Sequence, residues 1–292
     1  MNNLNLELNA LCSMQLDDGS FSMQQLNFGD GQKIKGKTNA LFSTCEVLLA
    51  IRSSLPKTVV KRALKFIESQ KQANGHWNWD ITFGIPDDAD DTCCAIAVLN
   101  GANNIQLKDV STCNKVITSY WDEKYKKFRT WQSNDVPWCN SDRFDVVVNC
   151  NSILAMRILR HSQLDYCVHY VQRMVDSTEM NRSRYYCSVF SVFYAAFRAG
   201  LNIKIERLEA HVKGQINTMN ALELAQSLIV IQKYSSDKQL ISNLTSRLWK
   251  FQEDDCTWPS CPWCDGENLL PWGSKAVTTA ISIRALKPTI ND

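Results

Sequence analysis

The chain has no long hydrophobic run and no block of basic residues. None of its uninterrupted apolar stretches approaches the roughly 18 residues that a membrane-spanning helix needs. Its 32 Lys and Arg nearly balance its 30 Asp and Glu, and the formal net charge of +2 argues against nucleic acid as a partner. The segment from Met1 to Leu8 also lacks a basic region followed by an apolar one, so we expect a cytoplasmic protein.

The sequence also lacks a linker between domains and any strong β alternation. Its two most loop-like stretches, 28–37 and 133–142, are interpreted as loops within one domain that spans residues 1–292. Because 45% of the 292 residues are hydrophobic, such a domain can bury a large core.

A repeated helical pattern fills most of the chain. Six apolar runs with small or polar residues in their first halves predict inner helices near 42–51, 91–99, 150–159, 187–197, 222–231 and 277–286. Amphipathic segments between them, such as 56–70 and 238–251, predict outer helices. This alternation favours an all-α fold, an (α/α)6 barrel of six inner and about six outer helices.

The 12 cysteines are scattered mostly through apolar helical runs, where a free thiol acts as a small hydrophobic side chain. We therefore expect reduced thiols. Cys256, Cys261 and Cys264 are gathered in one segment, but a single C-x-x-C without a second pair is a weak zinc signal. We name no metal ligand there and leave open whether these three bind a metal.

The most informative motif is an acidic run at 86–92, where Asp87, Asp88, Asp90 and Asp91 follow Pro86 with no basic residue beside them. Like charges this close raise the pKa of at least one carboxyl group, which makes that group a candidate general acid. The run precedes a predicted inner helix. It therefore also fits a solvated helix start, where the helix dipole favours Asp, or a site for a divalent metal ion.

Two motifs resemble those of squalene-hopene cyclases and other class II terpene cyclases. Residues 62–77 read R-A-x2-F-x3-Q-x4-G-x-W, similar to the QW repeat, with Gln70, Gly75 and Trp77 as its marks and shorter echoes at 15–21 and 252–258. In this motif Gln can bridge to the backbone of the next helix, while Gly allows a tight turn on which Trp packs. Asp88-Ala89-Asp90-Asp91 matches the family's D-x-D-D motif. The resemblance covers nearly the whole chain and implies a single-barrel member.

In such cyclases the middle Asp protonates a terminal alkene or epoxide. The resemblance therefore implies that Asp90 is the acid and that Asp88 and Asp91 support it, in an intramolecular lyase of the isomerase class that acts on a prenyl small molecule. Alkene protonation needs a strong acid in a dry cavity, and the resulting cation needs aromatic faces around it. The aromatic candidates are Trp79, Phe83, Trp131, Trp138, Tyr185, Tyr186, Phe190, Trp263 and Trp272.

Polar candidates complete the expected site. The run 144–151 is interpreted as a strand that places Asp145, Asn149 and Asn151 at the start of the third inner helix, where they either hold substrate or only cap the helix. Thr278 occupies the equivalent place on the last inner helix.

A single barrel favours a farnesyl- or geranylgeranyl-sized substrate over a triterpene. Protonation needs no cofactor, but a diphosphate substrate would bring Mg²⁺ and would need anion contacts. The candidates for these contacts are Lys33, Lys35, Lys37, Arg143, Arg182 and Arg184.

Other functions stay open. Asp87, Asp88 and Asp91 also read D-D-x-x-D, which resembles the magnesium motif of class I terpene synthases. A toroid protein prenyltransferase would need a partner subunit and a better set of zinc ligands than Cys261, Cys264, Asp265 and His211 provide. A glycosidase with two carboxylates would expose aromatic rings in an open groove. A lipid-binding protein remains an alternative, and so does peripheral membrane contact, because amphipathic outer helices suit either packing or a bilayer. Oligomeric state is not predicted.

Overall fold

The computed structural model describes residues 5–26, 40–79, 85–101, 110–133, 143–177, 183–264 and 270–287. Seven of the predicted residues lie outside these ranges, namely Lys33, Lys35, Lys37, Phe83, Trp138, Arg182 and Asp265.

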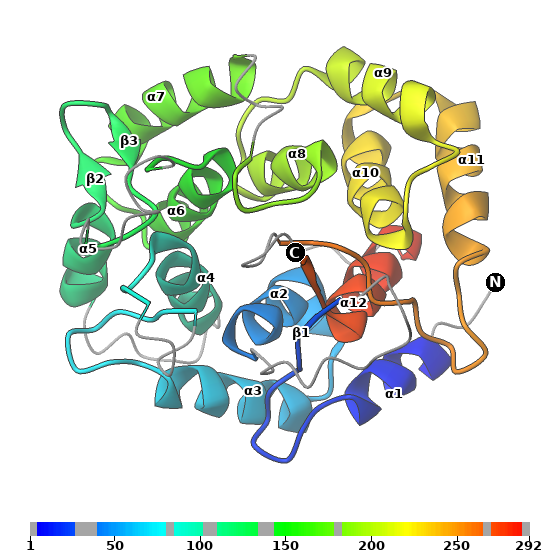
Figure 1. Ribbon diagram of the computed structural model, residues 1–292, viewed down its shortest axis with the longest axis horizontal. Helices are drawn as coiled ribbons and strands as arrows, with labels where there is room; N and C mark the ends of the chain where they lie inside the picture. Colours follow the sequence, from blue (N-terminus) through cyan, green and yellow to red (C-terminus); the bar gives the residue numbers. More distant parts are fainter. Residues whose placement is uncertain are drawn as a thin grey trace.

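Within these ranges the chain forms two concentric sets of helices (Figure 1). The inner set is α2 (Leu41–Ile51), α4 (Ala89–Asn100), α6 (Val146–Ile158), α8 (Val189–Arg198), α10 (Ala221–Tyr234) and α12 (Lys275–Leu286). The outer set is α1 (Asn5–Ser13), α3 (Lys57–Ser69), α5 (Val110–Thr118), α7 (Leu164–Asp176), α9 (Ile205–Gln215) and α11 (Lys238–Trp249). A short 3-10 turn, η1 (Arg52–Ser54), follows α2.

The inner helices form a closed ring. Each of them contacts the next inner helix along the chain, and α12 contacts α2. The predicted all-α barrel is therefore confirmed, and all six inner runs fall on inner helices. The two segments predicted as outer helices correspond to α3 and α11.

The two sets differ in composition because they have different neighbours. Inner helices are packed on all sides, and in α4 every residue from Ala89 to Val98 except Asp90 is buried. In α3, by contrast, only Ala63 and Ile67 are buried, which is the narrow apolar stripe of a helix with one face in water. None of the helices in the described ranges has the length and apolar character required to cross a membrane.

Three corners that lead from an outer helix into the next inner helix have the same structure. Each contains one residue with positive φ, namely Gly19 (95°), Gly75 (89°) and Cys256 (64°). Two positions later an aromatic residue donates its backbone amide to a threonine of the inner helix, the pairs being Phe21 with Thr44, Trp77 with Thr92 and Trp258 with Thr279.

Side chains at the corners also tie outer helices to them. The indole of Trp77 donates to the carbonyl of Ile67 at 2.8 Å. Gln15 bridges to the next outer helix through the carbonyl of Val59, at 2.9 Å, whereas the side-chain amide of Gln70 donates to the neighbouring Ser69. The expected glutamine bridge is thus made at the first copy.

Residues 144–151 were expected to form a strand, and this was wrong. Asp145 is instead the N-cap of α6, and its side chain accepts the amides of Val147 and Val148. This local hydrogen bonding favours a helix start over extended structure, despite the three consecutive valines.

Short strand pairings lie in the loops that precede the inner helices. β1 (Gln24–Gln25) pairs with β4 (Trp272–Gly273), and β2 (Trp121–Asp122) pairs with β3 (Lys127–Phe128), both antiparallel. Single bridges join Asp88 to Trp131 and Cys264 to both Tyr186 and Trp272. These pairings hold the loops together at one end of the ring, where the inner helices begin.

Candidate active site

Asp88 is the N-cap of α4 and is 3% exposed. Its Oδ1 accepts the amide of Asp91 at 2.7 Å, and its Oδ2 accepts the amide of Trp79 at 3.1 Å. Burial raises the pKa of Asp88 to about 7, although both amides favour its ionised form. Asp88 therefore caps the N-terminus of α4 and holds the backbone of Trp79 beside it.

Asp90 lies in the first turn of α4 and is held by side chains from neighbouring segments. Its Oδ1 accepts the side-chain amide of Asn151 from α6 at 2.7 Å, and its Oδ2 is hydrogen bonded to the hydroxyl of Tyr186. Burial raises the pKa of Asp90 to about 7, and these two contacts partly oppose the rise. Unlike Asp88 and Asp91, Asp90 is only partly buried and keeps some accessible surface.

Asp91 is 2% exposed, and its Oδ1 has no hydrogen-bond partner. Burial, followed by the charges of Asp88 and Asp90, raises its pKa well above the usual range, and the two side chains of Asp88 and Asp91 are hydrogen bonded. Burial therefore favours the neutral form of Asp91, which would relieve part of the repulsion among the neighbouring carboxylates.

An ion pair behind Asp90 was not found from the sequence. Arg198 at the end of α8 is paired with Glu46 of α2, and the side chains are 6% and 1% exposed. Arg198 also donates to Oδ1 of Asn151 at 2.9 Å. The signal was present, because Glu46 interrupts an apolar inner run and Arg198 ends another.

Aromatic rings gather beside the acids at the same end of the ring. Phe42, which the sequence reasoning missed, stacks on Trp263 with ring centroids 4.9 Å apart, and it also meets Trp79 at 6.0 Å and Tyr186 at 6.3 Å. Trp79 in turn meets Trp272 edge-on at 5.6 Å. Tyr186 therefore belongs both to this aromatic group and to the hydrogen bonds of Asp90.

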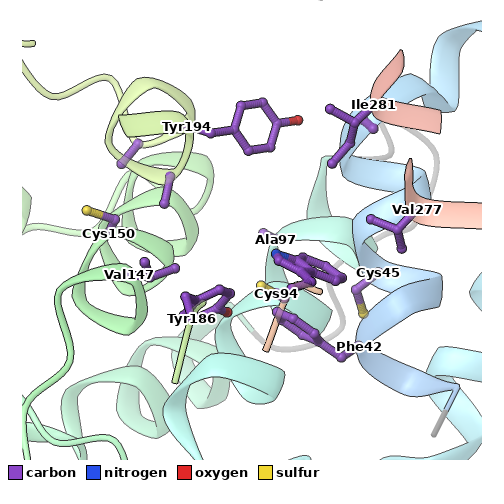
Figure 2. Packing of buried hydrophobic residues seen from close by; sticks show 14 of the residues in the cluster. Phe42, Cys45, Cys94, Ala97, Val147, Cys150, Tyr186, Tyr194, Val277 and Ile281 are labelled. Atoms are coloured by element: carbon purple, nitrogen blue, oxygen red, sulfur yellow. The ribbon is translucent and has the colours of Figure 1, made fainter. Parts of the chain in front are cut away.

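The interior next to this group is lined by small side chains. Figure 2 shows Cys45, Cys94, Ala97 and Cys150 around the ring, with Phe42 and Tyr186 side by side. Tyr194 extends from α8 toward Ile281 of α12 on the opposite wall (Figure 2). Its hydroxyl is buried and has no protein partner.

Three predicted polar residues are already occupied by protein groups. Asp145 binds the hydroxyl of Ser183 at 2.7 Å and the amide of Arg184 at 2.8 Å, in addition to capping α6. Asn149 exchanges hydrogen bonds with the backbone of Phe128. The hydroxyl of Thr278 donates to the carbonyl of Ser274, the N-cap of its own helix. These contacts account for structural roles, and substrate binding by the three stays a prediction.

The remaining aromatic candidates have contacts of their own. Trp131 donates from its indole to the Tyr185 hydroxyl at 2.9 Å, and the two rings meet edge-on. Phe190 is 1% exposed in the first turn of α8. Arg143 forms an ion pair with Asp122, and the Arg184 guanidinium lies over the Tyr185 ring at 6.0 Å.

Among the acids of the alternative D-D-x-x-D motif, Asp88 and Asp91 are hydrogen bonded to each other, but Asp87 has other partners. Asp87 is bound by the side-chain amides of Gln72 and Asn74, whereas Asp88 faces the start of α4. In the described ranges no three His, Cys, Asp or Glu side chains are placed to hold a metal ion. The cysteines in these ranges, including Cys256, Cys261 and Cys264, are free thiols.

Comparison with solved structures identifies the class of fold. The structure of a variant of the type II terpene cyclase MstE from Scytonema, in complex with geranylgeranyl dihydroxybenzoate, matches with a TM-score of 0.70 at 12% identity, covering 97% of this chain and 95% of that chain. The ent-copalyl diphosphate synthase from Streptomyces platensis matches with a TM-score of 0.58 at 12% identity, over 85% of this chain and 50% of that chain. The fold is therefore that of the terpene cyclase barrels.

The same barrel also carries other chemistry. A novel alpha-amylase from Clostridium perfringens matches with a TM-score of 0.67 at 10% identity, over 99% of both chains. No protein-family model and no curated protein sequence matches this chain. The function must therefore be argued from the site.

Proposed function

We propose that this protein is a class II terpene cyclase in which Asp90 protonates the terminal alkene of a linear prenyl substrate such as farnesyl or geranylgeranyl diphosphate. One observation carries the proposal. Asp90 is a carboxyl group with a pKa of about 7 that keeps some accessible surface and is hydrogen bonded to Tyr186, a member of the group of aromatic rings. Half of such groups hold a proton at neutral pH, so the acid is available without a cofactor.

The hydrogen bonds of Asp90 suit this task. As its proton moves to the terminal alkene carbon, the π electrons form the new C–H bond and the carboxyl group becomes a carboxylate. Asn151 and Tyr186 donate to that carboxylate and stabilise it, which makes Asp90 a stronger acid than burial alone would allow. A base later removes a proton from the product cation, or water is captured. Asp90 then regains a proton from solvent.

The aromatic group supplies the second requirement. A carbocation formed next to Asp90 would face the rings of Phe42, Trp79 and Tyr186, whose faces attract positive charge without forming bonds to it. Burial raises the pKa values of Cys45 and Cys94 well above the usual range, so they remain thiols and not thiolate nucleophiles.

Two observations favour this function over the alternatives. Phe42, Trp263 and Trp272 are at most 8% exposed, unlike rings that line the open groove of a glycosidase. Both oxygens of the Asp87 carboxylate are bound by Gln72 and Asn74, which disfavours a class I magnesium site. If the substrate carries a diphosphate, Mg²⁺ would accompany that group and not the acid.

The test compares purified wild type, Asp90→Asn and Asp87→Asn on farnesyl and geranylgeranyl diphosphates, with and without Mg²⁺. Extracts are analysed by mass spectrometry before and after phosphatase treatment. We expect cyclised alcohols only after phosphatase, a loss of at least about 100-fold in Asp90→Asn, and retained activity in Asp87→Asn. Products that form without phosphatase, need Mg²⁺ and vanish in Asp87→Asn would support class I chemistry. No product from either diphosphate in wild type would count against these substrates.

A further inference from the structure

The ion pair between Glu46 and Arg198 occupies an unusual place. Both side chains are almost fully buried, and burying two charges costs several kcal/mol unless other contacts offset it. Cys94 donates to the second oxygen of Glu46 at 3.8 Å, and the Arg198 guanidinium stacks on the Tyr194 ring at 4.9 Å. Through Glu46 and Asn151, Arg198 therefore joins α8 to α2 and α6 in the interior of the barrel.

Other arginines at the ends of inner helices behave differently. Arg52 donates to the carbonyl of Val98, Arg157 to that of Ala199 and Arg284 to that of Leu49, so each one caps a neighbouring inner helix. Arg198, in the last turn of α8, instead donates to Glu46 and to the side chain of Asn151. A capping role, which would explain the other three, does not explain Arg198.

The contact with Asn151 has a directional consequence. A guanidinium only donates hydrogen bonds, so the atom of Asn151 that faces Arg198 must be its oxygen. The amide NH₂ must then face Asp90, where it donates to Oδ1 at 2.7 Å. Without Arg198 the amide could rotate and accept a hydrogen bond from protonated Asp90, which would stabilise the acid and not its conjugate base.

We propose that Arg198, held by Glu46, is a positioning residue that locks the Asn151 amide with its NH₂ toward Asp90, and thereby keeps Asp90 a strong acid. The inference rests on the proposed function only for its consequence in catalysis. Because Glu46 neutralises Arg198, the pair acts through hydrogen-bond direction and brings no net charge to the site.

The test titrates Asp90 in the absence of any substrate. Infrared difference spectra follow the C=O stretch of protonated carboxyl groups against pH, and the band lost in Asp90→Asn identifies Asp90. The double variant Glu46→Gln/Arg198→Met removes both charges together and leaves no unpaired ion. Losing a hydrogen bond to the charged form should raise the apparent pKa of Asp90 by about one unit.

A second background, the variant Asn151→Leu, distinguishes positioning through Asn151 from a general disturbance of the site. In Asn151→Leu the amide is gone, so adding Glu46→Gln/Arg198→Met should produce no further shift. The same shift in both backgrounds, or none in the wild-type background, would overturn the inference. Circular dichroism checks folding. If the double variant unfolds, Arg198→Lys takes its place. Lysine keeps a cation opposite Glu46 but lacks the guanidinium fork that reaches Asn151. An unchanged pKa of Asp90 in Arg198→Lys would overturn the inference.

The titration also separates this inference from the proposed function. A protein that cyclises neither diphosphate yet shows the background-dependent shift would keep the positioning role and lose the cyclase assignment. An active cyclase without the shift would keep the cyclase assignment and lose the positioning role. In an active protein, the pH profile of the cyclisation rate should move upward with the infrared pKa.

Discussion

Replacing Asp90 by Asn should change how the stability of the protein depends on pH. The amide is nearly isosteric and can keep both hydrogen-bond partners, but it cannot ionise. The pKa of Asp90 is about 7 in the folded protein against 3.8 for an ordinary Asp. A raised folded-state pKa contributes stability that is fully present below the unfolded value and is lost as the pH rises through the folded one.

The size of the effect follows from the pKa difference. Each unit is worth about 1.4 kcal/mol, so wild type should lose about 4 kcal/mol relative to Asp90→Asn between pH values near 4 and those above 7. Most of this loss should fall between pH 5 and pH 7, with a plateau above. Asp88 and Asp91 contribute in the same direction in both proteins, and the part of their contribution that comes from burial cancels in the difference.

Urea denaturation at closely spaced pH values, followed by tryptophan fluorescence, measures this difference directly. The free energy of unfolding at pH 5 serves as the reference for each protein. We expect the free energy of unfolding of wild type to fall steadily relative to that of Asp90→Asn as the pH rises. Parallel curves for the two proteins would refute the reasoning, because Asp90 would then be ionised throughout and could not serve as a store of protons.

Further predictions concern the corners and the Tyr186 hydroxyl that is hydrogen bonded to Asp90. Trp77→Ala removes a buried indole and its bond to Ile67, and should lower the free energy of unfolding by about 3–5 kcal/mol in urea denaturation. Gly19→Ala should lower the melting temperature markedly, because φ is 95° and a Cβ would lie 2.5 Å from the carbonyl oxygen of Arg62. Cys256→Gly should leave the melting temperature equal or higher, since glycine relieves the strain at φ 64°, and a clear fall would contradict this. Tyr186→Phe should raise the pKa of Asp90 by about one unit in infrared titration, because a donor to the carboxylate is lost. An unchanged pKa would show that this contact does not tune the acid.

Much of the architecture was readable from the sequence because it depends on local order. Inner helices carry continuous apolar runs and outer helices carry an apolar stripe, and this difference follows directly from having neighbours on all sides or on one. The acidic motif was equally visible, since Asp88, Asp90 and Asp91 are adjacent in the chain. The strand expected at 144–151 failed because Asp145 caps a helix there, and a cap depends on one side chain more than on the valines that follow it.

Only the tertiary structure decided the different environments of Asp88, Asp90 and Asp91. Asp90 meets Asn151 across 61 positions and Tyr186 across 96, while Arg198 meets Glu46 across 152. No local pattern encodes such distances. By itself, the sequence determined the ring of helices and the place of the acids in it. Closure of the ring decided which carboxyl group keeps accessible surface, which donors hold it and how far burial raises its pKa, because desolvation and hydrogen bonding depend on what surrounds a group in space.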